Sequence, residues 1–411
     1  MFAPVQMPVQ MKEQRIDRAG PQLISPELRV LHIVESMDQQ AVETWLLRIL
    51  RGAQEAYAHV HWTFFCVLEE EGRLDEAARQ MGAEVIHSRY EIGDKRRFLL
   101  SLREVMKRGR YDILHCHHDI MSAAYLAASA GLPFRRRIVH VHNTSLSLPT
   151  PNKVKADLVR APMKQMCLHM ADQIVGISQD ALESLVGKRG TEPARQTVVH
   201  YGVDTARFAQ PTSKTAIFRR DLHRQLGLGT AARILLFVGR IVEYKNPVFL
   251  IEMLKHLVKV EPEAVAVFAG AGNLEPELRE LANKNSLVDH VRLLGFRDDV
   301  PDLMLSSDVL VWPSLEEPKE GLGLGIVEAQ AAGLPIVMSR SVPEEAIVVP
   351  ELVKVLPLAA GAKAWAEAAL AMLRGAQPNR KESLRKVEAS SFSMAQGVKN
   401  MMALYDLGPQ R

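Results

Sequence analysis

The sequence predicts an α/β fold of two successive doubly wound domains, and three observations support this prediction. Short apolar strands alternate with amphipathic helices, as expected for a mostly parallel sheet covered by helices on both faces. The alternation restarts at Arg233–Gly239, where a strand ends in glycine. The length of 411 residues suits two or three domains of ordinary size.

The first domain begins at Leu28. Arg29–Glu35 is an apolar run rich in strand-forming residues, and Glu43–Arg51 has the apolar spacing of a helix. The remaining elements predicted in this half are strands at Trp62–Leu68, Glu84–His87, Asp112–Cys116, Arg137–Val141 and Gln173–Ile177, with helical stretches at Phe98–Arg108 and Ala123–Ala130.

The second domain repeats the pattern. A helix is predicted from about Asn246 to Val260, and it is followed by strands at Ala264–Ala269, Val291–Leu294, Val309–Trp312 and Ile336–Met338. An amphipathic stretch, Met394–Tyr405, comes after the helices that complete this domain, and one placement for it is back across the domain junction. We therefore divide the chain into a flexible N-terminal tail (1–27), an N-terminal domain (28–200), a C-terminal domain (201–390) and a C-terminal helix (391–411).

The composition indicates a soluble globular protein of the cytoplasm. Hydrophobic residues make up 47% and charged residues 24% of the chain. The sequence contains no run of eighteen or more apolar residues, so we expect no transmembrane helix. The N-terminus lacks the apolar core of a secretory signal. Three scattered cysteines, Cys66, Cys116 and Cys167, match no metal-binding spacing and suit buried thiols in a reducing compartment.

The charge pattern argues against nucleic acid as a partner, because the net charge is only +3. Basic clusters occur at 95–97, at 107–110 and at 135–137. The favoured interpretation is solvated helix faces and loops. The alternative is peripheral contact with anionic lipid head groups at the inner face of a membrane, or with a phosphorylated acceptor.

The segment 313–335 (PSLEEPKEGLGLGIVEAQAAGLP) is the most informative in the chain. A strand ends at Trp312, a glycine-rich turn follows, and a helix begins near Leu324. Backbone amides in such a turn can approach a pyrophosphate, and the helix N-terminus favours its negative charge. Glu320 lies before the helix and Glu328 inside it, so one carboxylate can reach a sugar while the other faces a ribose. The alternative is a solvated loop and a surface helix.

A second segment, 237–247 (FVGRIVEYKNP), places two cations just beyond a strand end. Arg240 and Lys245 could clamp both phosphates of a nucleotide diphosphate and stabilise the leaving group, in place of a metal ion. The alternative is a surface arginine and a surface lysine.

Together these segments resemble the family-4 retaining glycosyltransferases, whose second domain carries Gly-Arg-x4-Lys and E-G-(F/L)-G-x4-E-A motifs. The corresponding residues are GRIVEYK at 239–245 and EGLGLGIVEA at 320–329. LLGFRDDVP at 293–301 is similar to the family's base-binding loop, and HYGVD at 200–204 resembles its N-G-V-D interdomain signature. The similarity extends from about Leu28 to Tyr405.

The resemblance implies a GT-B fold, in which two Rossmann-like, doubly wound domains face each other across a cleft. It implies that Glu320 contacts the donor sugar and Glu328 the ribose, and that Arg240 and Lys245 hold the pyrophosphate. The turn Gly323, Leu324 and Gly325 would face the phosphates, and Gly295, Phe296 and Arg297 would face the base. Family members are retaining and generally independent of metal ions, and the departing phosphate helps to deprotonate the acceptor hydroxyl.

The first domain resembles the acceptor half of family members that act in exopolysaccharide and lipopolysaccharide assembly. Those usually carry a Gly-Gly pair in the first loop, whereas this chain has Gln40 and Ala41, which have less φ freedom. DILHCHHD at 112–119 resembles the family's D-(I/V)-(V/I)-H-x-H strand end, which selects His117 as the histidine near the transferring sugar. Asn143 follows the next strand and would line the acceptor side.

The histidine cluster invites a metal hypothesis. His115 and His117 share one face of a strand, but no carboxylate or third histidine is securely placed with them, so we expect no zinc site. We interpret His115, His118, His140 and His142 as strand-end histidines bonded to neighbouring backbone. A basic helix with Lys153, Lys155, Arg160 and Lys164 is expected to pack by one face, with docking to a membrane as the alternative.

The leading hypothesis is therefore a metal-independent, retaining glycosyltransferase that needs no cofactor. It would move a sugar from a UDP- or GDP-linked donor to a glycan or polyprenyl-linked acceptor in cell-surface polysaccharide synthesis. The second hypothesis is a GT-B-fold sugar-nucleotide epimerase, which would use the same cleft without an acceptor, although the two glutamates and the Arg240–Lys245 pair fit the transferases better. A non-catalytic nucleotide-sugar-binding partner is the third hypothesis, and Gln40 and Ala41 are the residues that keep it open.

Overall fold

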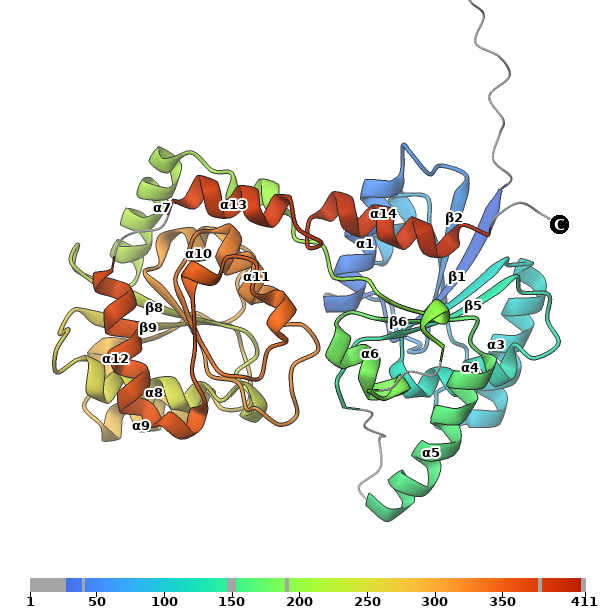
Figure 1. The fold of residues 1–411 in the computed structure, drawn as a ribbon, viewed down its shortest axis with the longest axis horizontal. Coiled ribbons are helices and arrows are strands. Elements are labelled where there is room, and N and C mark those ends of the chain that lie inside the picture. Colours follow the sequence, from blue (N-terminus) through green and yellow to red (C-terminus); the bar gives the residue numbers. More distant parts are fainter. Residues whose placement is uncertain (1–26, 39–40, 146–152, 189–191, 376–378, 408–411) are drawn as a thin grey trace, which may run out of the picture.

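The computed structural model describes residues 27–38, 41–145, 153–188, 192–375 and 379–407, apart from the side chains of 153–157. Two parallel sheets, each flanked by helices, form two lobes that lie side by side (Figure 1). The predicted fold class is confirmed. The expected tail at 1–27 lies outside the described residues except for its last position.

The first sheet has seven strands within the described residues, and they lie in the order β3-β2-β1-β4-β5-β6-β7. All its strand pairs are parallel. The strands are β1 (Leu28–Val34), β2 (Val60–Cys66), β3 (Glu84–His87), β4 (Ile113–Cys116), β5 (Arg136–Val141), β6 (Gln173–Gly176) and β7 (Gln196–Val198).

The second sheet repeats this topology with six strands in the described part, in the order β10-β9-β8-β11-β12-β13, again all parallel. The strands are β8 (Arg233–Val238), β9 (Ala264–Ala269), β10 (Val291–Leu293), β11 (Val309–Trp312), β12 (Ile336–Met338) and β13 (Val353–Val355). The sequence prediction missed β7 and β13, which are edge strands of three residues, although it found β10, an edge strand of the same length.

Helices connect the strands in both halves. Those of the first half are α1 (Ala41–Ala53), α2 (Asp75–Gln80), α3 (Lys95–Gly109), α4 (Ser122–Ala128), α5 (Lys153–Met170) and α6 (Gln179–Val186). Those of the second half are α7 (Thr212–Gln225), α8 (Pro247–Leu257), α9 (Glu275–Lys284), α10 (Val300–Ser306), α11 (Leu324–Ala331) and α12 (Gly361–Arg374). They are followed by α13 (Arg380–Glu388) and α14 (Met394–Tyr405).

Each sheet reverses its strand order at one point, between β1 and β4 in the first sheet and between β8 and β11 in the second. Ligands of open α/β sheets bind beyond the carboxyl ends of the strands at such a reversal. His117 follows β4, Arg240 follows β8, and the segment 313–320 follows β11. These residues thus lie at the two reversal points.

The chain crosses between the lobes a second time at its C-terminal end. Helix α13 packs against α11 of the second lobe, whereas α14 packs against α1 of the first (Figure 1). The Tyr405 hydroxyl lies 2.9 Å from Nδ1 of His115, and Arg136 donates to the carbonyl of Leu404 at 2.5 Å. Because of this arrangement, we propose that the domain boundary lies near residue 200 and that α14 belongs structurally to the first lobe.

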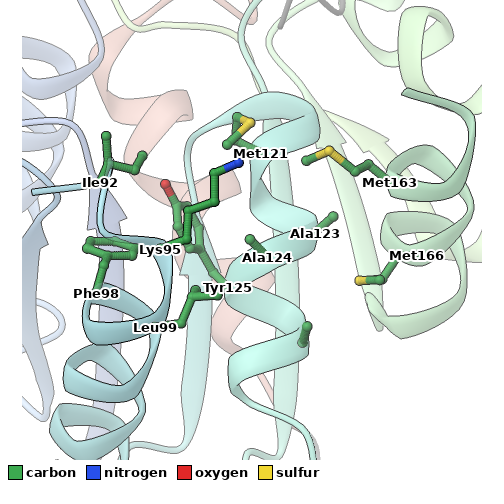
Figure 2. A pocket seen from close by; sticks show the side chains of 11 residues that line it. Ile92, Lys95, Phe98, Leu99, Met121, Ala123, Ala124, Tyr125, Met163 and Met166 are labelled. Carbon is green, nitrogen blue, oxygen red and sulfur yellow. The ribbon is translucent and has the colours of Figure 1, made fainter. Parts of the chain in front are cut away.

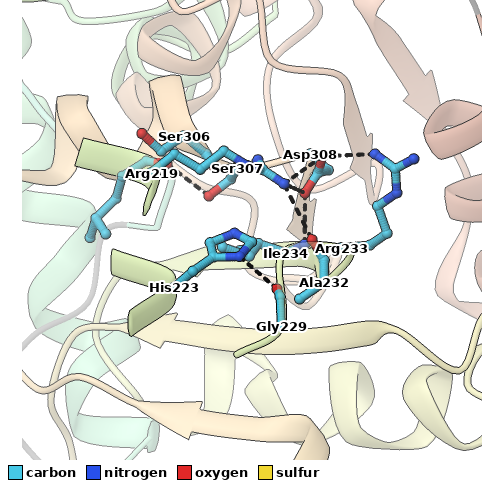
Figure 3. A network of polar contacts seen from close by, with 10 residues as sticks. Arg219, His223, Gly229, Ala232, Arg233, Ile234, Ser306, Ser307 and Asp308 are labelled. Atoms are coloured by element: carbon cyan, nitrogen blue, oxygen red, sulfur yellow. Dashed lines mark hydrogen bonds and ion pairs between the residues drawn. The ribbon is translucent and has the colours of Figure 1, made fainter. Parts of the chain in front are cut away.

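A polar network around Asp308 fixes the start of β11 in the second lobe (Figure 3). One carboxylate oxygen accepts from Nη2 of Arg219 on α7 at 2.9 Å and from the amide of Ile234 in β8 at 2.8 Å. Arg233 adds a contact at 3.4 Å. A single carboxylate therefore joins one helix to two central strands.

Replacing Asp308 with alanine should destabilise the second lobe. The change leaves the Arg219 guanidinium and the Ile234 amide without their partner, so we expect the free energy of unfolding to fall by about 2–3 kcal/mol. Urea unfolding monitored by circular dichroism measures this loss. Asp221→Ala removes an exposed partner of Arg220 and Arg224 and is the matched control, with an expected loss of about 0–1 kcal/mol. Equal losses in the two variants would contradict this role.

Candidate functional site

The carboxylate of Glu320 is the centre of the predicted site in the second lobe. One oxygen accepts from Nε1 of Trp312 at 2.7 Å and from the hydroxyl of Ser314. The other pairs with Nζ of Lys245 at 2.8 Å, and the ammonium lies 4.5 Å from the Trp312 ring centroid. The Glu320 and Lys245 side chains are only 8% and 13% exposed. The structure thus brings two of the predicted residues into direct contact.

Arg240 takes a more open position. Its guanidinium donates to the hydroxyl of Tyr244 at 2.6 Å, and the Lys245 ammonium lies 5.4 Å from the centroid of the same ring. Arg240 is exposed, and no carboxylate pairs with it within the described residues. Tyr244 therefore spaces the two cations along one loop and leaves the charge of Arg240 available to a ligand.

Two glycines at the start of α11 determine how this helix begins and how closely it packs. Gly323 precedes the helix with φ of +75°, a conformation that favours glycine. A Cβ on Gly325 would lie 2.9 Å from the Trp312 ring, so this glycine lets α11 approach the residue that holds Glu320. The first amides of a helix, here those of Leu324 and Gly325, have no partner within it and can bind an anion.

Glu328 lies one helical turn further along α11 and is half-buried. Burial raises the pKa of this carboxyl, while the positive charges of Arg48 and Arg207 oppose the increase. Arg48 belongs to α1 of the first lobe and Arg207 to η3 (Thr205–Phe208) after the first sheet. Glu328 thus faces the junction of the two lobes rather than open solvent.

The loop at 295–297 lies at the same edge of the sheet. Gly295 has φ of +67°, and its carbonyl accepts from the amide of Gly270 at 2.8 Å. Phe296 is 63% exposed. Arg297 binds Asp299 through two contacts of 2.8 and 2.5 Å, so its guanidinium is already occupied. Of the three predicted base-facing residues, Phe296 offers the free surface.

The loop at 319–321 also contacts the first lobe. Ser178 donates to the carbonyl of Gly321 at 2.5 Å, and Lys319 pairs with Asp180 at 2.9 Å. A Cβ on Gly321 would lie 2.2 Å from the carbonyl oxygen of His142, so only glycine permits this approach. The loop at 319–321 of the second lobe therefore rests on the strand ends of the first.

A chain of buried imidazoles crosses the first sheet on the face that α1 and α14 cover. His117 Nε2 lies 3.1 Å from His32 Nδ1, and His117 Nδ1 lies 3.1 Å from His142 Nε2. His115 Nε2 lies 3.1 Å from His140 Nδ1. His117, at 4% exposure, is therefore enclosed with both ring nitrogens bonded. The interpretation of His115, His140 and His142 as backbone-bonded histidines is wrong.

Two tyrosines extend this chain and set its direction. The Tyr201 hydroxyl lies 2.6 Å from His142 Nδ1, and the Tyr405 hydroxyl joins His115 Nδ1 to His32 Nε2 at 2.9 and 3.5 Å. If every imidazole is neutral and carries its proton on Nε2, each accepts once at Nδ1, and all but His140 donate once at Nε2. Only the Nε2–H of His140 then lacks an acceptor, and the His140 ring stands edge-on to Trp45.

The sequence placed no third histidine securely with His115 and His117, but the structure does. His32 joins them, and His140 and His142 form a second group with His117. In the three bonded pairs of histidines the ring centroids are 5.3–5.4 Å apart, and the two nitrogens that face each other are 3.1 Å apart. The centroid distance is close to the nitrogen separation plus the radii of the two rings, which is the value for rings placed end to end. The two nitrogens of each bonded pair thus point at each other in line, as in a hydrogen bond.

The other residues predicted for the acceptor side are Gln40, Ala41 and Asn143, and Gln40 lies outside the described residues. Ala41 is the exposed first residue of α1. Asn143 donates to Oδ2 of Asp119 at 2.7 Å, and Oδ1 of Asp119 accepts from the amide of His142 at 2.6 Å. His118 bonds to the Tyr125 hydroxyl at 2.8 Å rather than to backbone. Asn143 is thus fixed at the strand ends beside the imidazole chain.

Two family models match the chain. The model described as glycosyltransferase family 4 matches residues 42–207, and the model described as glycosyl transferases group 1 matches residues 218–386. Together they span most of both lobes. The first covers the half with the imidazole chain, and the second covers the half with Glu320.

Relatives and solved structures agree with these matches. The putative glycosyltransferase EpsF of Bacillus subtilis is 27% identical over 94% of this chain and 98% of its own. A galactosyltransferase of Escherichia coli that acts on GlcNAc-diphosphoundecaprenol is 29% identical over 65% and 67% of the two chains. HepE of Anabaena in complex with UDP has a TM-score of 0.73 at 18% identity, with 92% and 100% coverage. WaaG, a lipopolysaccharide glycosyltransferase, has a TM-score of 0.65 at 16% identity, with 92% and 97% coverage.

The imidazole chain should make the protein sensitive to acid. Burial lowers the pKa of His32 and of His142 to about 3, so both stay neutral in the folded state while the unfolded chain takes up protons below about pH 6.5. Their contribution to stability is complete above that pH and is lost as the pH falls toward 3. Between pH 7.5 and 5.5 we expect a loss of about 1 kcal/mol for each such histidine.

Thermal unfolding at pH 7.5 and 5.5 measures this loss as a decrease in Tm. His140→Phe removes the last member of the chain and should reduce the decrease, whereas His169→Gln, at an exposed position, should leave it unchanged. A wild-type Tm that is the same at both pH values would show that the imidazoles are not buried as neutral groups.

Proposed function

The chain belongs to the family-4 glycosyltransferases, and on this premise we propose that it is a retaining, metal-independent enzyme. It moves a sugar from a UDP- or GDP-linked donor to a lipid-linked glycan in cell-surface polysaccharide synthesis. The contact between Lys245 and Glu320 is the observation that carries this proposal. The relatives favour transfer over epimerisation or simple binding, because both family models and the two relatives described above are glycosyltransferases.

The hydrogen bonds of Glu320 leave it one acceptor position for a sugar. Each carboxylate oxygen accepts about two hydrogen bonds. The oxygen bonded to Trp312 and Ser314 is therefore saturated, whereas the one that pairs with Lys245 can accept once more. The Lys245 ammonium likewise keeps two of its three N–H groups. Glu320 would accept from a hydroxyl of the donor sugar while Lys245 donates to the adjoining phosphate.

The diphosphate would lie between this pair and the N-terminus of α11. Arg240 and Lys245 supply two positive charges, and the amides of Leu324 and Gly325 supply uncompensated donors in a turn set by Gly323. These groups stabilise the charge that develops when the bond between the sugar C1 and the phosphate oxygen breaks, the task a divalent cation has in other enzymes. The acceptor oxygen then bonds to C1, and its proton passes to the departing phosphate.

The rest of the nucleotide would extend along the same edge of the sheet. The exposed ring of Phe296, beside Gly295 and Arg297, offers a surface on which a base can stack. Glu328 would accept from the ribose hydroxyls, and the electrostatic influence of Arg48 on Glu328 supports a ribose position at the junction of the lobes. HepE, which shares the fold, binds UDP and UDP-glucose.

The acceptor would approach from the first lobe. Asn143 lies beside Asp119, and His117 follows β4 at the reversal of strand order. Because both ring nitrogens of His117 are bonded, its contact with the sugar would exchange the bond to His142 for one to a sugar hydroxyl. The Escherichia coli relative acts on a diphosphoundecaprenol-linked sugar, which supports a lipid-linked acceptor here.

We place the enzyme in the cytoplasm, at the inner face of the membrane. None of the described helices has both the length and the hydropathy of a membrane-crossing segment. The basic residues at 95–97 are exposed and suit contact with anionic head groups. Those at 135–137 serve the fold instead, since Arg137 donates to backbone carbonyls of residues 129–134 and Arg136 to α14.

Replacing Glu320 with alanine should lower kcat by about 100-fold or more, because the carboxylate that orients both the sugar and Lys245 is lost. Release of UDP or GDP from a panel of nucleotide sugars, with a polyprenyl-linked acceptor present, measures turnover. Glu317→Ala, an exposed position in the same loop, is the control and should keep wild-type activity. Full activity of the Glu320 variant, with an unchanged circular dichroism spectrum, would exclude this carboxylate from the reaction.

Removal of divalent cations should leave turnover unchanged, because Arg240 and Lys245 supply the positive charge at the diphosphate. The test compares initial rates in excess EDTA with rates in added Mg²⁺ and Mn²⁺. Lys245→Ala should lower kcat by about 100-fold under both conditions. Activity that disappears in EDTA and returns with a divalent cation would contradict the proposed mechanism.

A further inference from the structure

An apolar pocket of about 290 Å³ opens between three helices of the first lobe (Figure 2). Phe98 comes from α3, Tyr125 from α4, and Met163 and Met166 from α5, while Met121 closes one end. The volume is near the lower limit of pockets that bind small molecules, about 300–1,000 Å³. The pocket is therefore large enough for part of a hydrocarbon chain.

The lining favours a hydrocarbon over a peptide. Of the two lining side chains with polar groups, the Tyr125 hydroxyl is already bonded to His118 at 2.8 Å, and the Lys95 ammonium lies at the rim (Figure 2). A peptide would bury amide groups here without partners, which is unfavourable, whereas a hydrocarbon needs none. Methionine side chains adapt to irregular apolar shapes.

The rim carries the charge that an anionic head group requires. Lys95 and Arg96 are exposed at the start of α3, and neither pairs with a carboxylate within the described residues. Arg97 is partly engaged, at 3.5 Å from Asp94. Exposed apolar side chains continue from the pocket onto the surface, with Ile92 at 42% and Met166 at 36% exposure. An apolar interior beside free cations matches a lipid with an anionic head group.

The pocket adjoins the acceptor side of the proposed site. A single 3-10 turn, η1 (Asp119–Met121), links the two: Asp119 at its start holds Asn143, and Met121 at its end lines the pocket. A hydrocarbon chain bound between the helices would therefore leave the pocket beside the residues expected to face the acceptor.

We propose that this pocket binds the isoprenoid chain of the lipid-linked acceptor, with the phosphate next to Lys95 and Arg96. The inference rests on the proposed function for the identity of the lipid. The pocket itself is tested separately from the chemistry at Glu320.

The experiment measures binding of two probes to the full chain by equilibrium dialysis, farnesyl diphosphate and uncharged farnesol, both below their micelle concentrations. Excess inorganic pyrophosphate occupies the diphosphate site of the second lobe. Ala127→Trp fills the pocket from an exposed position on its wall and should weaken both probes at least tenfold. Ala130→Trp, exposed but outside the lining, is the matched control. Lys95→Glu should weaken farnesyl diphosphate at least fivefold and leave farnesol unchanged.

The proposal is supported if Ala127→Trp weakens binding of the probes and Ala130→Trp does not. Equal affinity in wild type and Ala127→Trp, or no binding of either probe by the wild type, would overturn it. UDP binding to the same variants is measured in parallel without pyrophosphate and should be unchanged. If the wild type binds neither UDP nor GDP, that result would count against the proposed function and not against the pocket.

Discussion

The position of one carboxylate constrains most of the second lobe. Glu320 is held by Trp312 at the end of β11, by Ser314 in the following loop, and by Lys245 from the loop after β8. These donors meet only if β8 and β11 are adjacent, which the reversal of strand order provides. Gly325 allows α11 to approach Trp312, whose ring the Lys245 ammonium also approaches. We propose that this arrangement, which pairs Glu320 with Lys245, also binds the diphosphate.

The first lobe is organised around polar groups of a different kind. Its sheet carries five buried histidines on the face covered by α1 and α14, where apolar side chains would be usual. Neutral imidazoles linked in one direction satisfy almost all of their hydrogen bonds, so the layer is compatible with a packed interior. Tyr405 completes it from α14, which makes the C-terminal helix part of the core of the first lobe. The lobes are therefore joined by the chain at two places, and by the contacts of 319–321.

The sequence predicted the fold and most strands, because short apolar runs alternate with amphipathic helices. The strands that it missed are β7 and β13, both at sheet edges. The contact between Lys245 and Glu320 joins residues 75 positions apart and followed from family motifs rather than from spacing. The imidazole chain could not be predicted, because it depends on the register of β1, β4 and β5. Alternation placed His115 and His117 on one face, and His32 could have been added only with that register. The apolar pocket depends on helix packing and has no signature in the sequence.

We propose that the two cations and two carboxylates of the second lobe converge on one diphosphate-linked sugar. A crystal structure of the protein with an intact UDP- or GDP-sugar would show whether they do. We expect the diphosphate within hydrogen-bond distance of Lys245, Arg240 and the first amides of α11, with a sugar hydroxyl on the free acceptor position of Glu320. A nucleotide sugar bound elsewhere, with the contact between Lys245 and Glu320 closed and the N-terminus of α11 unoccupied, would contradict it.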